Sequence, residues 1–326
     1  MIQATLTPAV IGPAEAALRE MQLKAETFET IASAFVSFQQ VHHNTPATYL
    51  RSLRQFNAWV NASGRALASL NKSDILAFIN DMRAGHYSPN TINSYVTAVR
   101  RFYVWLEEMG LARNIAANIR SEKYDELHVK KDFTASQAVA ILKAAENNKR
   151  DFAILNLMLY CGLRVSEISN ATIGDIQLIG DSYFIQVLGK GDKVRRVPIP
   201  AEAMAAINDY KQAERKGAKD AEPLFASKAH QCKGGKMATA SISRMAKDAI
   251  RSIGIDDKKH TAHSLRHTTA GIMYEAGVPL PRIQKVLGHS NIATTEIYAK
   301  DAMERDYLAS TPNECIADAL KAAAAI

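Results

Sequence analysis

Apolar residues recur at intervals of three and four along the first third of the chain, which is the spacing of an amphipathic helix. The clearest example is 45–64, TPATYLRSLRQFNAWVNASG, where Thr45 is the expected N-cap, Pro46 the first helical residue and Gly64 the residue past the last turn. Four apolar residues share one face: Tyr49, Leu53, Phe56 and Trp59. The pattern predicts a helix that buries this face.

Two further segments have the same period. SDILAFINDMRAG is expected to open on Ser73 and stop at Gly85, and SPNTINSYVTAVRRFYVWLEEMG to open on Ser88 and close on Gly110. With a preceding helix, they predict a small all-α bundle over residues 25–115. Its arginines alternate with the apolar positions, so a basic surface is expected on the solvent side.

The period changes to two after residue 175. IQLIGDSYFIQVLGKGDKVRRVPIP predicts strand, turn, strand, Gly-rich turn and strand, and hence a short antiparallel sheet of about three strands. A helix with Thr134 as N-cap comes before it, and helices dominate from about residue 201. Charges of both signs with little apolar pattern predict a linker at 116–132, or else a charged helix at the edge of either domain.

The length of 326 residues exceeds the size at which one core usually stops growing, so two domains are expected. We predict a mainly α protein in which the helical bundle precedes a mixed α/β domain with a small antiparallel sheet. The predicted boundaries are 1–24 for an N-terminal extension, 25–115 for the bundle, 116–132 for the linker and 133–326 for the second domain.

Composition describes an ordinary globular protein, with 47% hydrophobic and 22% charged residues. There is no long apolar run, and MIQATLTPAVIGPAEAALRE lacks a basic flank followed by an apolar core, so neither a membrane span nor a signal peptide is predicted. The expected location is the cytoplasm. Cys161, Cys232 and Cys315 are odd in number and far apart, which favours reduced thiols over a disulfide framework or a CxxC metal site.

The net charge of +7 and pI near 9.2 suggest a polyanionic partner, although a solvated basic surface explains them equally well. Basic residues gather in two stretches, 51–101 and 190–196. The candidate DNA contacts within them are Arg51, Arg54, Arg100, Arg101, Lys193, Arg195 and Arg196.

Six residues in chain order could act on a phosphodiester: Arg164, Lys190, His263, Arg266, His289 and Tyr298. Each is weak evidence alone, because most tyrosines only pack and most histidines are solvated or satisfied. Together they supply two arginines to clamp the non-bridging oxygens, a lysine to protonate the leaving oxygen, and histidines to exchange a proton with a tyrosine nucleophile. Neither metal-ligand spacing nor a phosphate-binding P-loop is present, so no metal and no cofactor is expected.

The segments GLRVSE, HSLRHTTAG and LGHSNIATTEIY, with Lys190 between two glycines, resemble the tyrosine recombinase (phage integrase) family, in particular its Xer-like and phage or plasmid members. The resemblance implies a core-binding bundle and a catalytic domain that cleave and rejoin DNA through a 3′-phosphotyrosyl link to Tyr298. Glu167 matches an acidic position that supports the catalytic residues. Lys193 competes with Lys190 for the lysine role, and the flanking glycines favour Lys190.

The resemblance also implies the partners. They are duplex DNA with a pair of inverted binding arms, clasped by both domains, further copies of the chain that form a tetramer on two sites, and possible accessory proteins. The C-terminal tail has an apolar stripe suited to docking on a neighbouring copy or on its own domain: Ile316, Ala319, Leu320 and Ala323. Ile292 and Ile297 are expected to pack the helix that carries Tyr298.

Other functions share some of these features. A type IB topoisomerase-like nicking and closing enzyme uses the same chemistry, a catalytically silent regulator would retain only DNA binding, and a basic helical interaction protein would explain the charge alone. The complete catalytic set favours a recombinase. Integration, excision, resolution and inversion remain equally open, as does the target sequence.

Overall fold

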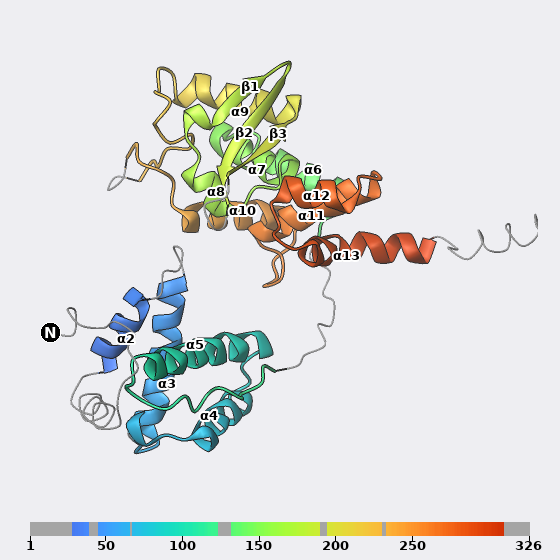
Figure 1. Cartoon of the computed structure of the whole chain (residues 1–326). Helices are drawn as coiled ribbons and strands as arrows, with labels where there is room; N and C mark the ends of the chain where they lie inside the picture. Colours follow the sequence, from blue (N-terminus) through green and yellow to red (C-terminus); the bar gives the residue numbers. More distant parts are fainter. Residues whose placement is uncertain are drawn as a thin grey trace, which may run out of the picture. The chain divides into compact units, whose positions relative to one another are not determined.

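The chain divides into two compact units, 1–127 and 128–326. The computed structural model describes residues 28–38, 45–65, 67–122, 132–189, 194–229 and 233–309. The first unit is helical, and the second combines helices with one small sheet (Figure 1). This confirms the predicted fold class. Among the described residues, no helix is long and apolar enough to cross a membrane.

The helices of the first unit enclose an aromatic core. They are α2 (Phe28–Phe38), α3 (Thr45–Ala62), η1 (Leu67–Ser69), α4 (Lys72–Ala84) and α5 (Pro89–Glu108). The side chains of Phe35, Phe56, Phe102 and Trp105 are at most 1% exposed. Ser88 caps α5 as predicted, because its hydroxyl accepts the Thr91 amide at 3.2 Å.

Two boundaries of this unit differ from the predicted ones. Helix α4 is capped by Asn71 rather than Ser73, since the Asn71 side chain accepts the Ser73 amide and Asp74 accepts the Asn71 amide, both at 2.8 Å. Ala116 and Ile119, placed in the predicted linker, are buried in the bundle core. The first unit therefore extends beyond residue 115.

The second unit is built around a three-stranded antiparallel sheet of order β1-β2-β3. Its strands are β1 (Ile176–Ile179), β2 (Ser182–Leu188) and β3 (Val194–Ile199). Its helices are α6 (Ala135–Ala144), α7 (Lys149–Tyr160), α8 (Val165–Asn170), η2 (Ile173–Asp175), α9 (Ala201–Glu214), α10 (Thr239–Ser252), α11 (Ala262–Glu275), α12 (Leu280–Leu287) and α13 (Ile292–Ala309). Ile185 and Val197 pair across the sheet and are fully buried in the core shared with α7 and α9.

Helix α11 has polar side chains in a buried position. It packs against α7, which is green in Figure 1, and against α12 and α13, which are orange and red. Its buried polar residues are Ser264, Arg266, His267, Thr268 and Thr269. Buried polar groups require partners, so this helix is where a functional site is expected.

Cys161 is fully buried beneath the sheet. Burial raises the pKa of its thiol to about 12, so the thiol remains protonated and unreactive. Cys232 and Cys315 lie outside the described residues.

Candidate active site

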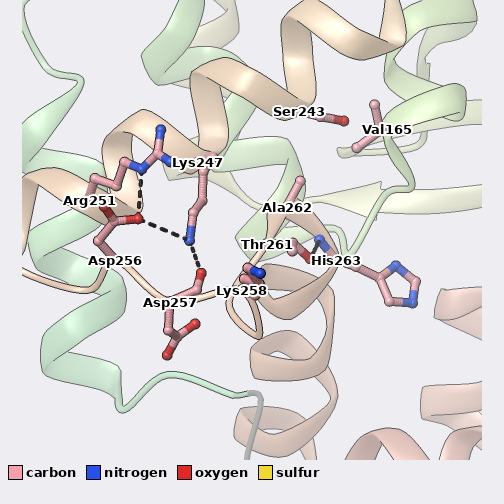
Figure 2. Close-up of a pocket in the computed structure, with 10 residues that line it drawn as sticks. All are labelled: Val165, Ser243, Lys247, Arg251, Asp256, Asp257, Lys258, Thr261, Ala262 and His263. Carbon is pink, nitrogen blue, oxygen red and sulfur yellow. Dashed lines mark hydrogen bonds and ion pairs between the residues drawn. The ribbon is translucent and has the colours of Figure 1, made fainter. Parts of the chain in front are cut away.

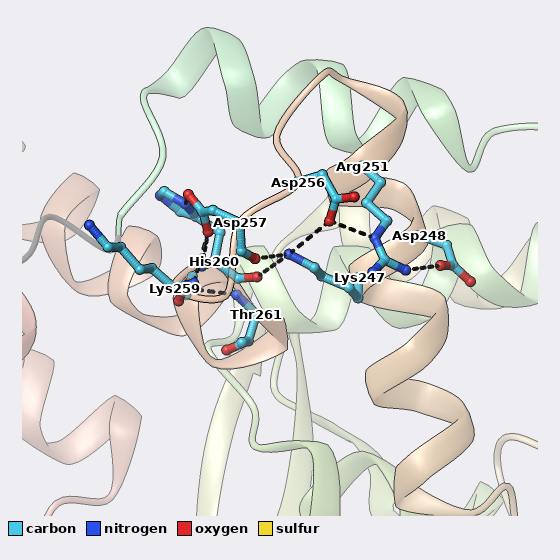
Figure 3. Close-up of polar contacts among 9 residues, drawn as sticks. Lys247, Asp248, Arg251, Asp256, Asp257, Lys259, His260 and Thr261 are labelled. Atoms are coloured by element: carbon cyan, nitrogen blue, oxygen red, sulfur yellow. Dashed lines mark hydrogen bonds and ion pairs between the residues drawn. The ribbon is translucent and has the colours of Figure 1, made fainter. Parts of the chain in front are cut away.

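A polar network stabilises the loop that leads into α11. Lys247 on α10 donates to the backbone carbonyls of Asp257 and of His260, the latter at 3.0 Å, and Arg251 pairs with Asp256 at 2.9 Å (Figure 3). The Asp257 carboxylate accepts the amide of His260 at 2.8 Å. These bonds fix where α11 begins, and therefore where its first turn points.

His263 lies in that first turn. Thr261 caps α11 and accepts the His263 amide at 3.3 Å. A pocket of about 630 Å³ lies between α10 and the loop. Figure 2 shows His263 at one end of it and Arg251 and Asp256 at the other. The His263 ring is exposed at this edge.

Arg266, one turn further along α11, is 1% exposed. Its guanidinium donates to the carbonyls of Gly162 and Leu287. Burial, with the nearby positive charge of Arg164, lowers the pKa of Arg266 to about 10, so the side chain stays charged at neutral pH. A buried charge of this kind destabilises the fold unless a group of opposite charge or a set of hydrogen-bond acceptors compensates it.

Glu167 binds two arginines. Its carboxylate is 2% exposed and lies 2.9 Å from Arg164 Nη1 and 2.8 Å from Arg195 Nη1. Burial alone would raise the pKa of Glu167, but hydrogen bonds and charge from Arg195 and then Arg164 outweigh it and keep the pKa below its usual range. Arg164 is thereby fixed at the N-terminus of α8.

Arg195 corrects a sequence interpretation. Grouped with the DNA-contacting or solvated residues of the hairpin, it is instead 14% exposed and directed inward from β3. It donates to both Glu167 oxygens, at 2.8 and 3.0 Å, and to the Val286 carbonyl at 3.1 Å. The prediction was wrong because neighbouring residues of a strand face opposite sides, and Arg196 takes the exposed one.

Carbonyl groups at the C-terminus of α12 accept hydrogen bonds from these arginines. Besides the bonds from Arg195 and Arg266, Arg164 lies 3.4 Å from the Leu287 carbonyl and 3.5 Å from that of Gly288. The last carbonyls of a helix have no partner within it and carry partial negative charge, so they suit cations. Gly288 has φ +66°, and a Cβ there would approach Arg195 to 2.7 Å, so both backbone and space require glycine.

Tyr298 on α13 lies among three imidazoles. Its hydroxyl is hydrogen-bonded to Nε2 of His263. His267 stacks on its ring, with centroids 3.9 Å apart and planes at 11°, and His289 lies 4.5 Å away. The Arg266 guanidinium carbon is 5.8 Å from the ring centroid. Three predicted catalytic residues, His263, Arg266 and His289, therefore lie around Tyr298, and Arg164 is joined to Arg266 through the Leu287 carbonyl of α12.

Ring protonation is set by this basic surrounding. Burial, followed by the charges of Arg266, Arg164, Arg195 and His263, lowers the pKa of His289 to about 3. The ring is therefore neutral at physiological pH. Burial raises the pKa of Tyr298, while the charges of Arg266 and Arg164 and a hydrogen bond from Arg266 oppose that rise. No group of three His, Cys, Asp or Glu placed to hold a metal ion occurs in the part of the chain that the structure describes.

Comparison with known proteins identifies this arrangement. Residues 131–305, more than half of the chain, match the phage integrase family model, and residues 36–110 match the family's N-terminal SAM-like domain. The chain belongs to the phage integrase family.

The relatives are Xer recombinases. Tyrosine recombinase XerD of Caulobacter vibrioides is 30% identical over 290 residues, covering 85% of this chain and 93% of that protein. Tyrosine recombinase XerC of Caldanaerobacter subterraneus subsp. tengcongensis is 32% identical over 229 residues, covering 68% of this chain and 62% of that protein. The chain is accordingly a tyrosine site-specific recombinase, and these similarities give no support to a topoisomerase or a silent regulator.

A solved structure shows the same fold. The crystal structure of the XerH site-specific recombinase bound to palindromic difH substrate, a post-cleavage complex, superposes with a TM-score of 0.71. The alignment covers 95% of this chain and 92% of that one at 18% identity.

The structure brings together five of the six candidate catalytic residues of the recombinase, while Lys190 and its competitor Lys193 lie outside the described residues. It also adds His267 and Thr295, which sequence reasoning did not single out. His267 follows Arg266 directly and is four residues from His263 on the same helix, a spacing that could have suggested it.

Another expectation about α13 was wrong. Ile292 and Ile297 are 38% and 49% exposed, so they do not pack the helix. Its buried side is formed instead by small residues, namely Thr295, Ala299 and Ala302, each fully buried. Small side chains allow α13 to approach α11 closely.

The candidate DNA contacts of the first unit have different surroundings. Arg51 and Arg101 are exposed. Arg54 forms a surface ion pair with Glu29 at 2.9 Å. Arg100 is half-buried and lies 3.4 Å from the Ser121 hydroxyl. Arg51 and Arg101 are therefore the better candidates for phosphate contact.

Replacing His289 with glutamine is expected to weaken the pH dependence of stability. The folded pKa of about 3 lies below the ordinary 6.5, so as pH falls the unfolded chain binds a proton first. The resulting loss in the free energy of unfolding is absent above pH 6.5 and grows as the pH falls toward 3. Between pH 7 and 5 it amounts to about 2 kcal/mol. Urea unfolding of the recombinase at both pH values should show His289→Gln losing about that much less; equal losses would contradict the lowered pKa.

Proposed function

We propose that this recombinase cleaves DNA by attack of Tyr298 Oη on a scissile phosphate. The Oη–P bond forms and the P–O5′ bond breaks, which leaves a 3′-phosphotyrosyl link and a free 5′-hydroxyl. The Tyr298 proton passes to Nε2 of His263. Lys190 protonates the leaving oxygen, a role that rests on the family resemblance. Attack by the 5′-hydroxyl of a partner strand reverses the step, and no external energy source is required.

The observation that carries this proposal is the hydrogen bond between Tyr298 Oη and His263 Nε2. A phenol with a raised pKa is a poor nucleophile by itself, and an imidazole nitrogen within hydrogen-bond reach is a suitable general base for it. His263 Nε2 is therefore both within hydrogen-bond reach of the nucleophile and able to accept its proton.

Charge on the phosphate is stabilised by the surrounding cations. Arg164 and Arg266 are oriented by carbonyls of α12 and by Glu167, so they need little reorganisation when charge develops on the non-bridging oxygens. His289 contributes a neutral donor. Such preorganised donors are typically worth about 3 kcal/mol each in transition-state stabilisation.

The substrate is duplex DNA with two inverted arms. The XerH structure carries a palindromic DNA substrate, and the first unit of this chain matches the SAM-like domain of the family. We assign phosphate contacts to the exposed Arg51 and Arg101 and to Arg196 of the second unit.

A covalent-adduct assay tests the proposal. The recombinase is incubated with duplex carrying its inverted-repeat site and a nick beside the scissile phosphate, and denaturing gels reveal the protein–DNA adduct. We expect an adduct on the 3′ end of the cleaved strand with the site and little with a scrambled site. Equal yield on both would favour a topoisomerase-like enzyme, and no adduct on the site would contradict the proposal.

We further propose that four copies of the chain assemble on two DNA sites, and that residues 310–326 join neighbouring copies. An apolar groove of about 310 Å³ lies between α6, α7 and α11, with Val139 51% and Ile272 39% exposed along it. The stripe of Ile316 and Leu320, which lies outside the described residues, suits such a surface on a neighbouring copy.

Deletion of residues 310–326 is expected to prevent assembly while single-site DNA binding is retained, because the lost contact joins copies and not DNA. Val139→Asp should have the same effect by placing a charge in the groove. Sedimentation of complexes on two-site DNA measures assembly, with exposed Val104→Asp of the first unit as the control. Normal assembly of the truncated chain would refute tail docking.

A further inference from the structure

His289 carries a buried nitrogen without a partner. The side chain is 7% exposed, and its Nδ1 lies 3.0 Å from Oγ1 of Thr295. Nε2 is buried as well and has no hydrogen-bond partner among the described residues. Buried polar atoms are almost always satisfied, so an orphaned one points to a ligand. Because the His289 and Tyr298 rings lie 4.5 Å apart, that ligand would bind beside the nucleophile.

The Thr295 hydroxyl is directed at His289 and not at its own helix. Threonines in helices commonly donate to the carbonyl four residues before, as Thr268 and Thr269 do in α11 at 3.0 and 3.1 Å. Thr295 is fully buried, and among the described residues its hydroxyl bonds only His289. Its hydrogen is therefore available to Nδ1.

A neutral imidazole has one N–H, so the partner of one nitrogen decides the role of the other. If Nδ1 accepts the hydrogen of Thr295, the proton of the ring must lie on Nε2. Burial and the charges of Arg266 and Arg164 keep the pKa of His289 near 3, so the doubly protonated form does not compete at physiological pH.

We propose that Thr295 is a positioning residue that fixes His289 in its Nε2–H form and thereby presents a neutral donor to the scissile phosphate. The inference rests on the proposed function, in which His289 contacts that phosphate. The opposite tautomer would direct a lone pair at an anionic oxygen and repel it. Thr295 and Tyr298 are three residues apart on α13. One helical turn therefore carries both the nucleophile and the residue that determines which nitrogen of His289 is protonated.

Nitrogen-15 NMR of histidine-labelled protein without DNA measures the tautomer directly, with the His289 signals assigned by their loss in His289→Gln. The wild type and Thr295→Ser are expected to show a protonated Nε2 and an unprotonated Nδ1. Thr295→Val, which has the same shape without the hydroxyl, should shift toward protonated Nδ1. A protonated Nδ1 in the wild type, or an unchanged spectrum in Thr295→Val, would overturn the proposal.

Single-turnover cleavage of the nicked site gives the second readout. Thr295→Val should slow adduct formation about 10- to 100-fold with little change in DNA affinity, as removal of a residue that orients a site group commonly does. Thr295→Ser should restore the rate. Thr294→Val, a half-buried neighbour on α13, is the matched control and should cleave normally. If Thr295→Val lowers the melting temperature, Thr295→Ala replaces it, provided that the alanine variant melts at the wild-type temperature. It also lacks the hydroxyl, so the same slower adduct formation is expected.

The outcomes separate this inference from the proposed function. If Thr295→Val cleaves at the wild-type rate while His289→Gln cleaves slowly, the role of Thr295 alone is overturned. A normal cleavage rate in His289→Leu, which has no hydrogen-bond donor, would overturn both the phosphate contact of His289 and the inference that depends on it.

Discussion

Tyr298→Phe is expected to bind its DNA site normally and to form no covalent adduct. The substitution removes the attacking oxygen and its hydrogen bond to His263. Cleavage should fall by roughly four orders of magnitude or more, as when a covalent nucleophile is removed from other enzymes. Gel detection of the adduct and quantitative DNA binding measure the two properties separately.

Stability should hardly change, because phenylalanine retains the ring that stacks on His267 and contacts His289. The lost hydrogen bond is worth about 1 kcal/mol. Tyr274→Phe is the matched control, since Tyr274 packs against the same apolar cluster and its hydroxyl lies 3.4 Å from an Asp306 carboxylate oxygen and not from a catalytic residue. An adduct of normal yield in Tyr298→Phe would mean that another residue attacks the DNA.

Glu167→Gln is expected to cause the largest loss of stability among single changes at the site. The carboxylate is 2% exposed and compensates Arg164 and Arg195 together. Removing one partner from a buried ion pair leaves an uncompensated charge and costs about 3 to 5 kcal/mol. Cleavage should fall as well, since Arg164 loses the group that orients it. Urea unfolding and the adduct assay measure these effects.

The matched control is Glu214→Gln, which removes a surface pair with Lys228 whose side chains are 28% and 58% exposed. Its cost should be at most about 1 kcal/mol. Because the folded pKa of Glu167 is lowered, its contribution is present above the ordinary carboxyl pKa and disappears as pH falls through the folded value. The difference between wild type and Glu167→Gln should therefore shrink in acid. Equal losses for the two variants would refute the role assigned to Glu167.

Much of the fold could be predicted because its determinants are local. Ser88 and Thr134 cap the helices that follow them, and alternation along 176–199 produces the sheet. A cap or a period depends on residues within a few positions of one another. The same locality explains the error at Asn71, which competes with Ser73 only two residues away.

The interior of the site could not be predicted in this way. Arg195 looked like its basic neighbours, and only the packing of β3 against α12 and α8 directs it to Glu167. Arg164 and Leu287 are 123 residues apart, yet their contact orients a catalytic arginine. Ile292 and Ile297 looked like core residues, but the orientation of α13 exposes them and buries Thr295.

Residue types and their spacing were sufficient to predict the helices and strands, the family, and the ordered set of Arg164, His263, Arg266, His289 and Tyr298. The surroundings of each of these side chains in the protein without DNA depend on the fold. It buries Arg266 against the end of α12, keeps His289 neutral beside three cations, and joins Tyr298 to His263. The physical reason is that residue type and spacing act over a few positions, whereas charge state and hydrogen-bond partner depend on groups that only folding brings together.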